Sequence, residues 1–166
     1  MTEFVHQRYK PLSPLDQPRE LIVACPPLRS NVNLSRIIRA AGCCGVTRVL
    51  CTGTAKVIRK IARDGADAVE VEVHRTLEPQ LEKLCGEGYA LVGLEQTSGS
   101  QSLFDYPFAR KTVLVLGNER TGITEEILSL LDATVEIPTY GMPYSHNVAT
   151  AAAMGVYEYC RRYPRG

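Results

Sequence analysis

The chain has 166 residues, of which 45% are hydrophobic and 22% charged, which is the size and make-up of one globular domain with one core. Its net charge of +1 excludes a strongly basic or strongly acidic protein. The first twenty residues hold charges and prolines but no apolar run of secretory-signal length, and no later run is long enough to span a membrane. We therefore expect a cytoplasmic protein with no membrane partner.

Short apolar runs rich in β-branched residues predict six strands, as in a sheet covered on both faces. These runs cover residues 21–25, 48–51, 69–73, 89–94, 112–117 and 134–138. The run VEVEV at 69–73 alternates apolar and acidic residues, which is typical of an edge strand.

Between the strands, apolar residues recur at helical spacing. In 33–45 the residues that follow the i, i+3, i+4, i+7 pattern are Leu34, Ile37, Ile38 and Ala41. The same periodicity predicts helices at about 55–63, 76–85, 124–131 and 147–161. The alternation predicts an α/β fold with a six-strand, mainly parallel sheet and helices on both faces. Its ligand should bind beyond the carboxyl ends of the strands.

Cysteine and histidine do not form a metal motif in this sequence. The six cysteines include no C-x-x-C pair, and most lie in apolar runs where a thiol behaves as a small hydrophobic group. The three histidines, His6, His74 and His146, are widely separated. We expect buried free thiols and no metal.

Charge is distributed unevenly along the chain. Residues 1–63 hold eleven Lys/Arg against three Asp/Glu, a net charge of +8, and the remainder holds eight against fifteen, a net charge of −7. Scattered surface charge and a polyanion-binding face explain this charge asymmetry equally well. Helical spacing of Lys56, Arg59, Lys60 and Arg63 would gather four positive charges on one side of a short helix, which favours binding.

Two C-terminal segments, 113–122 and 137–149, each place an apolar strand before a loop of glycines, carboxamides and hydroxyls. Such loops shape the backbone around a polar ligand, so they are the candidate active site. The first strand is followed by CPPLRSNVNL, which lacks the glycines of a dinucleotide-binding loop, and a Walker loop is also absent.

Three segments resemble a known family when taken together and in order: NVNLSRIIRAAGCCGV (31–46), VLVLGNERTGI (113–123) and IPTYGMPYSHNVATAAAMGVYE (137–158). They are similar to the three motifs of the SpoU (TrmH-like) branch of the SPOUT RNA ribose 2′-O-methyltransferases. The resemblance covers about residues 21–161. GYALVGLEQT and GITEEIL further resemble the branch that methylates tRNA, which implies a D-loop guanosine as the target.

This resemblance implies a SPOUT methyltransferase domain at 21–166 behind an N-terminal extension at 1–20. It also implies a C-terminal trefoil knot, S-adenosylmethionine as cofactor, and a homodimer whose sites are each completed by an arginine of the partner. The RNA partner would be tRNA more readily than rRNA. Knots are too rare for composition or periodicity to predict one.

The family motifs assign roles to individual positions. The matching catalytic positions are Asn33, Arg39, Glu119, Ser145 and Asn147. The cofactor-binding positions are Leu94, Glu95, Gly117, Asn118, Gly122, Ile137, Met142 and His146. The expected RNA-binding residues are Arg36, Lys56, Arg59, Lys60 and Arg63. His146 stands where relatives carry a leucine against the cofactor adenine, so we expect altered or pH-dependent cofactor binding.

Each of these residues also has a purely structural interpretation. Arg36 and Arg39 fit the solvated side of a helix, Ser145 and Asn147 fit a helix cap, and Glu119 fits an exposed loop carboxylate. The functional interpretation is favoured because the structural one requires an independent coincidence at each of these positions. Two alternatives stay open, an rRNA 2′-O-methyltransferase and an inactive SPOUT RNA-binding module, and a flavodoxin-like protein is more distant.

Overall fold

The computed structural model of the protein describes residues 3–166 and contains one parallel sheet. Its seven strands lie in the order β3-β2-β1-β6-β4-β7-β5, and every neighbouring pair runs parallel. The strands are β1 (Leu21–Cys25), β2 (Arg48–Thr52), β3 (Glu70–His74), β4 (Ala90–Leu94), β5 (Gln101–Ser102), β6 (Thr112–Val115) and β7 (Ala133–Glu136). All six expected strands are present, and β3, the alternating segment, lies at an edge as predicted.

The expectation of six strands was wrong by one. The additional strand, β5, has only two residues and both are polar, so no apolar run marks it in the sequence. It forms by pairing with β7 at the edge of the sheet, where Gln101 lies opposite Val135. The next residue, Leu103, is buried and donates its backbone N–H to Glu136 O at 2.8 Å, which holds β5 in place.

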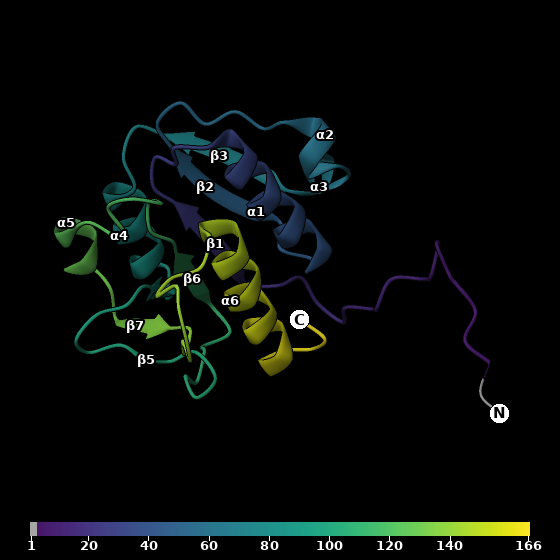
Figure 1. Ribbon diagram of the computed structural model, residues 1–166. Coiled ribbons are helices and arrows are strands. Elements are labelled where there is room, and N and C mark those ends of the chain that lie inside the picture. The colour runs from purple at the N-terminus through teal and green to yellow at the C-terminus, as the bar shows by residue number, and fades with distance from the viewer. Residues whose placement is uncertain (1–2) are drawn as a thin grey trace.

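Helices cover both faces of the sheet, as the pattern predicted (Figure 1). They are α1 (Asn31–Cys43), α2 (Arg59–Ala62), α3 (Gly65–Ala68), α4 (Glu78–Gly86), α5 (Glu125–Leu128) and α6 (Val148–Arg162). The two long helices α1 and α6 lie side by side on one face, and α4 and α5 lie on the other.

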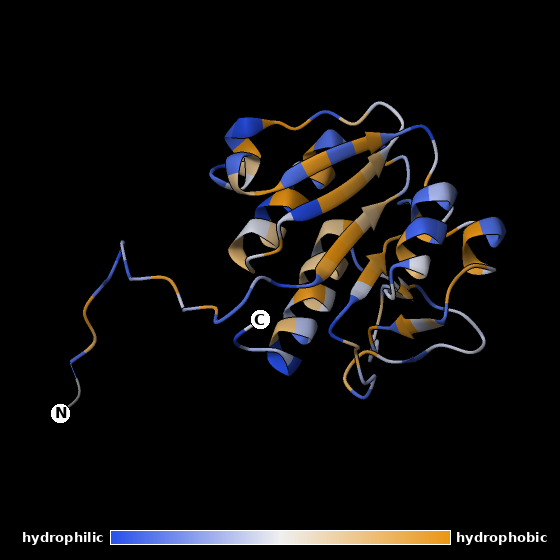
Figure 2. Ribbon diagram, turned by 180° about the vertical axis from the view of Figure 1, so that it is seen from behind, coloured by the Kyte–Doolittle hydropathy of each residue, from blue (hydrophilic) through white to orange (hydrophobic). Residues whose placement is uncertain are grey.

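The core has two parts because successive side chains of a strand point to opposite faces. Leu21, Val23 and Cys25 of β1 belong to the part under α1 and α6, and Ile22 and Ala24 belong to the part under α4 and α5. Figure 2 shows the resulting band of hydrophobic residues along the central strands. The thiol prediction was correct only in part, because Cys43 and Cys85 are exposed.

Helix α6 packs closely on the sheet at Gly155. A Cβ at this position would lie 3.0 Å from Leu114 Cδ2 and 3.3 Å from Leu94 Cδ2, tighter than most side chains tolerate. One turn further on, Tyr159 is fully buried and its hydroxyl donates to Arg110 O at 2.6 Å. These contacts fix the position of α6, and therefore of the segment that precedes it.

The helix predicted at 55–63 does not form as a single element. Only Arg59–Ala62 is helical, and Arg63 ends the helix with φ 54 and ψ −139, outside the helical region. The segment before it is held on α1 instead, because Lys56 N donates to Asn31 Oδ1 at 3.0 Å and Ile58 N donates to Ser35 Oγ at 2.8 Å. Side chains of α1 thus compete successfully with helix formation here.

Residues 3–20 contain no helix or strand and extend away from the body of the molecule (Figure 1). The segment is attached at its C-terminal end, where Asp16 pairs with Arg165 at 2.7 Å. The buried Arg19 donates to Cys44 O and Tyr163 O, both at 2.5 Å, so it joins the ends of α1 and α6. Within residues 3–166, no helix is long and apolar enough to cross a membrane.

Candidate active site

A cavity with a volume of about 500 Å³ lies where the carboxyl ends of β4, β6 and β7 meet the start of α6. Its lining comes from residues 94–96, 117–122, 136–137 and 145–151. Parallel strands bring these loops to one edge of the sheet, although the lining residues Leu94 and Ala151 lie 57 positions apart in sequence. This is the edge where the sequence predicted a ligand site.

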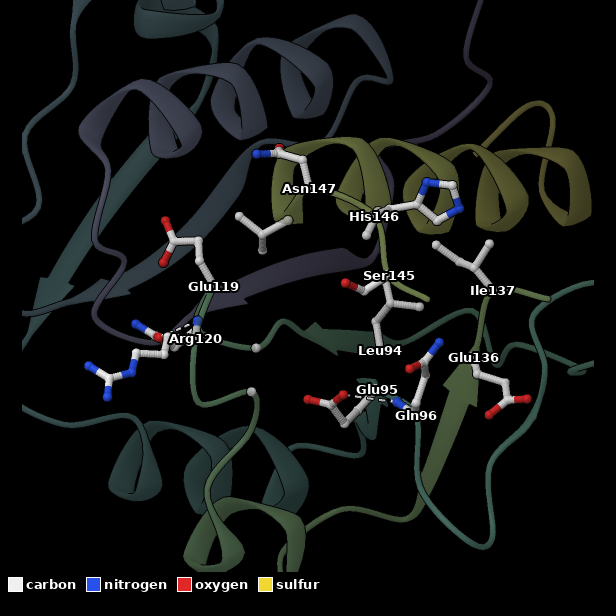
Figure 3. A pocket seen from close by; sticks show the side chains of 15 residues that line it. Leu94, Glu95, Gln96, Glu119, Arg120, Glu136, Ile137, Ser145, His146 and Asn147 are labelled. Carbon is white, nitrogen blue, oxygen red and sulfur yellow. Dashed lines mark hydrogen bonds between the residues drawn. The ribbon is translucent and has the colours of Figure 1, made fainter. Parts of the chain in front are cut away.

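Most of the predicted cofactor positions surround this cavity. The residues that line it are Leu94, Glu95, Gly117, Asn118, Gly122, Ile137 and His146. Figure 3 shows Glu119 and Arg120 at one end of the cavity and Ile137 and His146 at the other. Met142 does not line it, because its side chain points into solvent and is 72% exposed.

Three of the five predicted catalytic residues, Asn33, Glu119 and Asn147, are joined by hydrogen bonds across three segments of the sequence. Asn33 Nδ2 on α1 donates to Glu119 Oε1 at 3.0 Å. Asn147 Nδ2 donates to Asn33 Oδ1 at 3.1 Å, and Asn147 Oδ1 accepts from Ala149 N at 2.9 Å, which caps α6. Asn147 therefore caps α6, which is its purely structural role, and also lies on the cavity wall. This series of hydrogen bonds fixes the orientation of the Asn33 and Asn147 carboxamides.

Glu119 is held by donors on the segment that begins α1. Its Oε2 accepts from Arg29 N at 2.9 Å, and its Oε1 accepts from Ser30 N at 3.2 Å in addition to Asn33. Burial raises the pKa of this carboxyl, but the hydrogen bonds from Arg29 N, Asn33 and Ser30 N outweigh burial and hold the pKa below its ordinary value. Glu119 is therefore ionised at neutral pH.

Glu95 supports the glycine-rich loop. Its Oε2 accepts from Ile123 N at 3.0 Å and its Oε1 from Gln96 N at 2.9 Å, so backbone groups satisfy both oxygens. The loop turns back through two hydrogen bonds of 3.0 Å between Asn118 and Gly122. Gly122 has φ 68, and a Cβ there would lie 2.5 Å from Glu95 Oε2. The positive φ, together with this close approach, favours glycine at the position.

The cavity offers several kinds of contact to a ligand. Leu94, Ile137, Val148 and Ala151 provide apolar walls, and polar groups gather at the rim. A volume of several hundred Å³ that combines apolar walls with oriented polar groups suits a nucleoside-sized molecule. Ser145 lies on the wall and makes no hydrogen bond within residues 3–166, so its hydroxyl is available to a ligand.

The structure does not bring Arg39 to this cavity. Arg39 lies on α1 six positions beyond Asn33, which is about 9 Å along a helix axis. Its side chain is exposed, as is that of Arg36, and neither makes an ion pair within residues 3–166. Arg39, which was predicted to be catalytic, and Arg36, which was predicted to bind RNA, therefore both face solvent on α1.

The basic cluster around α2 is exposed but less positive than the sequence suggested. Lys56, Arg59, Lys60 and Arg63 all face solvent. They do not share one side of a helix, because only part of the segment is helical. Arg59 Nη2 pairs with Asp67 Oδ1 of α3 at 2.5 Å, so one of the four charges is neutralised locally.

Sequence reasoning missed several residues of the site. Arg29 and Ser30 hold Glu119 through their backbone N–H groups, and Arg120, Gln96 and Glu136 line the cavity. Arg120 lies within the glycine-rich segment that the sequence singled out, and Gln96 follows Glu95 directly. For these two the signal was adjacency to predicted residues. For the backbone donors the sequence carried no signal, since any residue except proline supplies an N–H.

Comparison with known proteins agrees with the motif resemblance. Residues 20–157 match the SpoU rRNA Methylase family. The chain is 32% identical over 142 residues to the tRNA (guanosine(18)-2′-O)-methyltransferase of Escherichia coli (strain K12), covering 84% of this chain and 62% of the relative. It is 28% identical over 144 residues to the enzyme of the same name from Aquifex aeolicus (strain VF5), covering 84% of this chain and 68% of the relative.

Solved structures share the fold. The A. aeolicus TrmH/SpoU tRNA modifying enzyme superposes with a TM-score of 0.83 at 27% identity, covering 88% of this chain and 76% of the other. The SpoU methyltransferase AviRb from Streptomyces viridochromogenes, in complex with the cofactor AdoMet, gives a TM-score of 0.78 at 26% identity, covering 90% and 63%. The chain thus spans about 62% of the length of the E. coli relative.

Proposed function

Because the chain belongs to the SpoU rRNA Methylase family, we propose that it transfers a methyl group from S-adenosylmethionine to the 2′-hydroxyl of an RNA ribose. The proposed RNA is tRNA, with a D-loop guanosine as the first candidate nucleotide. The names of the relatives support this choice, since both compared enzymes are tRNA (guanosine(18)-2′-O)-methyltransferases. The observation that carries the proposal is the Glu119–Asn33–Asn147 chain at the rim of a nucleoside-sized cavity.

The cavity fits S-adenosylmethionine by size and by chemistry. Leu94, Ile137 and Val148 would contact the adenine, and Figure 3 shows His146 at the same end of the cavity as Ile137. The carboxylates of Glu95, Glu119 and Glu136 in the lining give the site a negative potential that suits a cationic ligand. When bound, the cofactor supplies an activated methyl group on a sulfonium, and no metal is needed.

The residues around Asn147 would position the acceptor ribose. Ser145 and Asn147 lie on the same wall, and Asn147 is oriented by Asn33 and thus by the ionised Glu119. Fixing two reactants in line contributes about 7–11 kcal/mol in the best cases, so positioning can supply much of the rate enhancement. We assign Glu119 and Asn33 to positioning, because every oxygen of the Glu119 carboxylate already accepts a hydrogen bond from α1 or the segment before it.

Arg39 would act across a homodimer. It lies away from the cavity of its own subunit, and the exposed Met154 and Tyr157 on α6 add apolar surface to the face formed by α1 and α6. Pairing this face with a second copy would bring Arg39 of the partner subunit towards the cavity. A guanidinium stays positively charged in proteins and offers no proton-accepting atom, so we assign Arg39 to clamping an RNA phosphate and stabilising charge on the 2′-oxygen.

Four further predictions belong to this proposal. The order β1-β6-β4, in which a late strand lies between two earlier ones, is compatible with a C-terminal trefoil knot. The division into an extension at 1–20 and a SPOUT methyltransferase domain at 21–166 stays a prediction, and so does the cytoplasmic location. Exposed Arg36, Lys56, Lys60 and Arg63 are the proposed contacts to RNA phosphates.

A methyl-transfer assay tests the proposal. The protein is incubated with labelled S-adenosylmethionine and either total tRNA or total rRNA, and the labelled nucleotide is mapped as an alkali-resistant linkage. Label in a tRNA D-loop guanosine is the expected result. Label only in rRNA would favour the alternative that the family's own description suggests. RNA binding without any transfer, together with no cofactor binding in calorimetry, would favour an inactive RNA-binding module.

A further inference from the structure

The loop that joins β7 to α6 is held to the rest of the protein by very few contacts. Residues 138–146 form no helix or strand, and every side chain from Thr139 to His146 is exposed. Tyr140, the most exposed of its large side chains, is 90% accessible. Nevertheless Ser145 and His146 at the end of this loop line the cavity. Something must therefore keep a solvent-exposed segment in a defined position beside the ligand.

Gln96 makes the hydrogen bonds that do this. Its Nε2 donates to Tyr144 O at 2.9 Å and lies 3.5 Å from Thr139 Oγ1, a longer contact. Within residues 3–166, these are the hydrogen bonds that connect 138–146 to other segments. One carboxamide group thus reaches both the beginning and the end of the loop. Figure 3 shows this side chain rising from the end of β4 towards the segment that carries Ser145.

Gln96 is itself fixed to a rigid part of the fold. It is the second residue after the end of β4, and its backbone N donates to Glu95 Oε1. The other oxygen of Glu95 accepts from Ile123 N in the glycine-rich loop. The neighbours Glu95 and Gln96 therefore hold one cavity loop each, and both are attached to a central strand of the sheet.

We propose that Gln96 is a positioning residue that latches 138–146 over the cavity and thereby sets the affinity for S-adenosylmethionine. This inference rests on the proposed function, because it assumes that the loop contacts that cofactor. Without the Gln96 hydrogen bonds, the loop samples more conformations, and the ligand must order it on binding. The apparent affinity is then reduced in proportion to the fraction of molecules in which the loop is correctly placed.

Replacing Gln96 with methionine tests the latch, since methionine has similar length and no N–H groups. We expect Gln96→Met to weaken binding of S-adenosylmethionine about tenfold in calorimetry, which corresponds to about 1.4 kcal/mol. The melting temperature should not change, because the Gln96 side chain is exposed. Gln101→Met is the matched control, an exposed glutamine whose side chain makes no hydrogen bond within residues 3–166. It should bind as the unaltered protein does.

Two measurements separate positioning from a general structural effect. The Michaelis constant for the cofactor should rise in Gln96→Met more than kcat falls, and RNA affinity should stay constant. Cleavage by chymotrypsin after Tyr140 and Tyr144 should become faster and should again be suppressed by saturating cofactor. Equal cofactor affinity in Gln96→Met and the unaltered protein would overturn the latch. If the unaltered protein binds no S-adenosylmethionine, the proposed function itself fails instead.

Discussion

Replacing Glu119 with glutamine tests whether this carboxylate joins the glycine-rich loop to α1. Its two oxygens accept from Asn33 Nδ2, Ser30 N and Arg29 N. Glutamine keeps one oxygen and turns an NH₂ group towards at least one of these donors, so at least one hydrogen bond is lost. Such bonds to a charged group contribute about 1.5–3 kcal/mol. Because Glu119 is exposed, solvent screening reduces the expected loss of unfolding free energy to about 1–2 kcal/mol.

The loss should depend on pH. The pKa of Glu119 is lowered in the folded protein: burial raises it, and the hydrogen bonds from Arg29 N, Asn33 and Ser30 N outweigh burial. A group with a lowered folded pKa stabilises the protein above its unfolded pKa of about 4.3 and loses this contribution as pH falls through the folded pKa. The stability difference between the two proteins should therefore be complete at pH 7 and shrink below about pH 4.

Urea unfolding at pH 7 and at about pH 3.5 measures both effects. Glu82→Gln is the matched control, since Glu82 is an exposed glutamate on α4 with no hydrogen bond or ion pair within residues 3–166. Turnover should fall as well, because Asn33 loses the acceptor that orients it towards Asn147. If Glu119→Gln and Glu82→Gln unfold at the same urea concentration at pH 7, the carboxylate does not join these segments as described.

Three other substitutions probe separate parts of the structure. Gly122→Ala places a Cβ 2.5 Å from Glu95 Oε2 at φ 68 and should weaken cofactor binding at least tenfold in calorimetry; unchanged affinity would mean that the loop adapts easily. Arg39→Lys should keep measurable turnover with unchanged RNA affinity, and near-total loss of turnover would contradict a purely electrostatic role. Tyr159→Phe leaves Arg110 O without its donor and should lower the unfolding free energy by about 1–2 kcal/mol in urea, whereas an exposed tyrosine-to-phenylalanine control should not.

Local signals in the sequence predicted those elements that local interactions create. Apolar runs identified the six longer strands, and the spacing of Leu34, Ile37 and Ile38 identified α1. The two-residue β5 escaped detection because only its pairing with β7 makes it a strand. The helix predicted at 55–63 was shortened by tertiary contacts, since hydrogen bonds to α1 hold the first half of that segment in another conformation.

The site was predictable at the level of loops and less so at the level of contacts. Glycines and carboxamides after apolar runs marked both cavity loops, and the family motifs marked Asn33 and Glu119. Their direct contact spans 86 positions, and no local pattern encodes it. The exposure of Met142 and the role of Gln96 depend on how the loop folds back on β4, which follows from the assembled sheet rather than from either segment alone.

Because all strands of the sheet run parallel, their carboxyl ends lie at one edge of the sheet and their amino ends lie at the opposite edge. The cavity occupies the edge at the carboxyl ends, and the turns that lead into the strands lie at the other. Cys85 is exposed near the end of α4, shortly before β4 begins, and therefore lies at the edge formed by the amino ends of the strands. A fluorescent dye attached there, once Cys43 is replaced by serine, would test the proposed RNA binding from a distance without occupying the edge that holds the cavity.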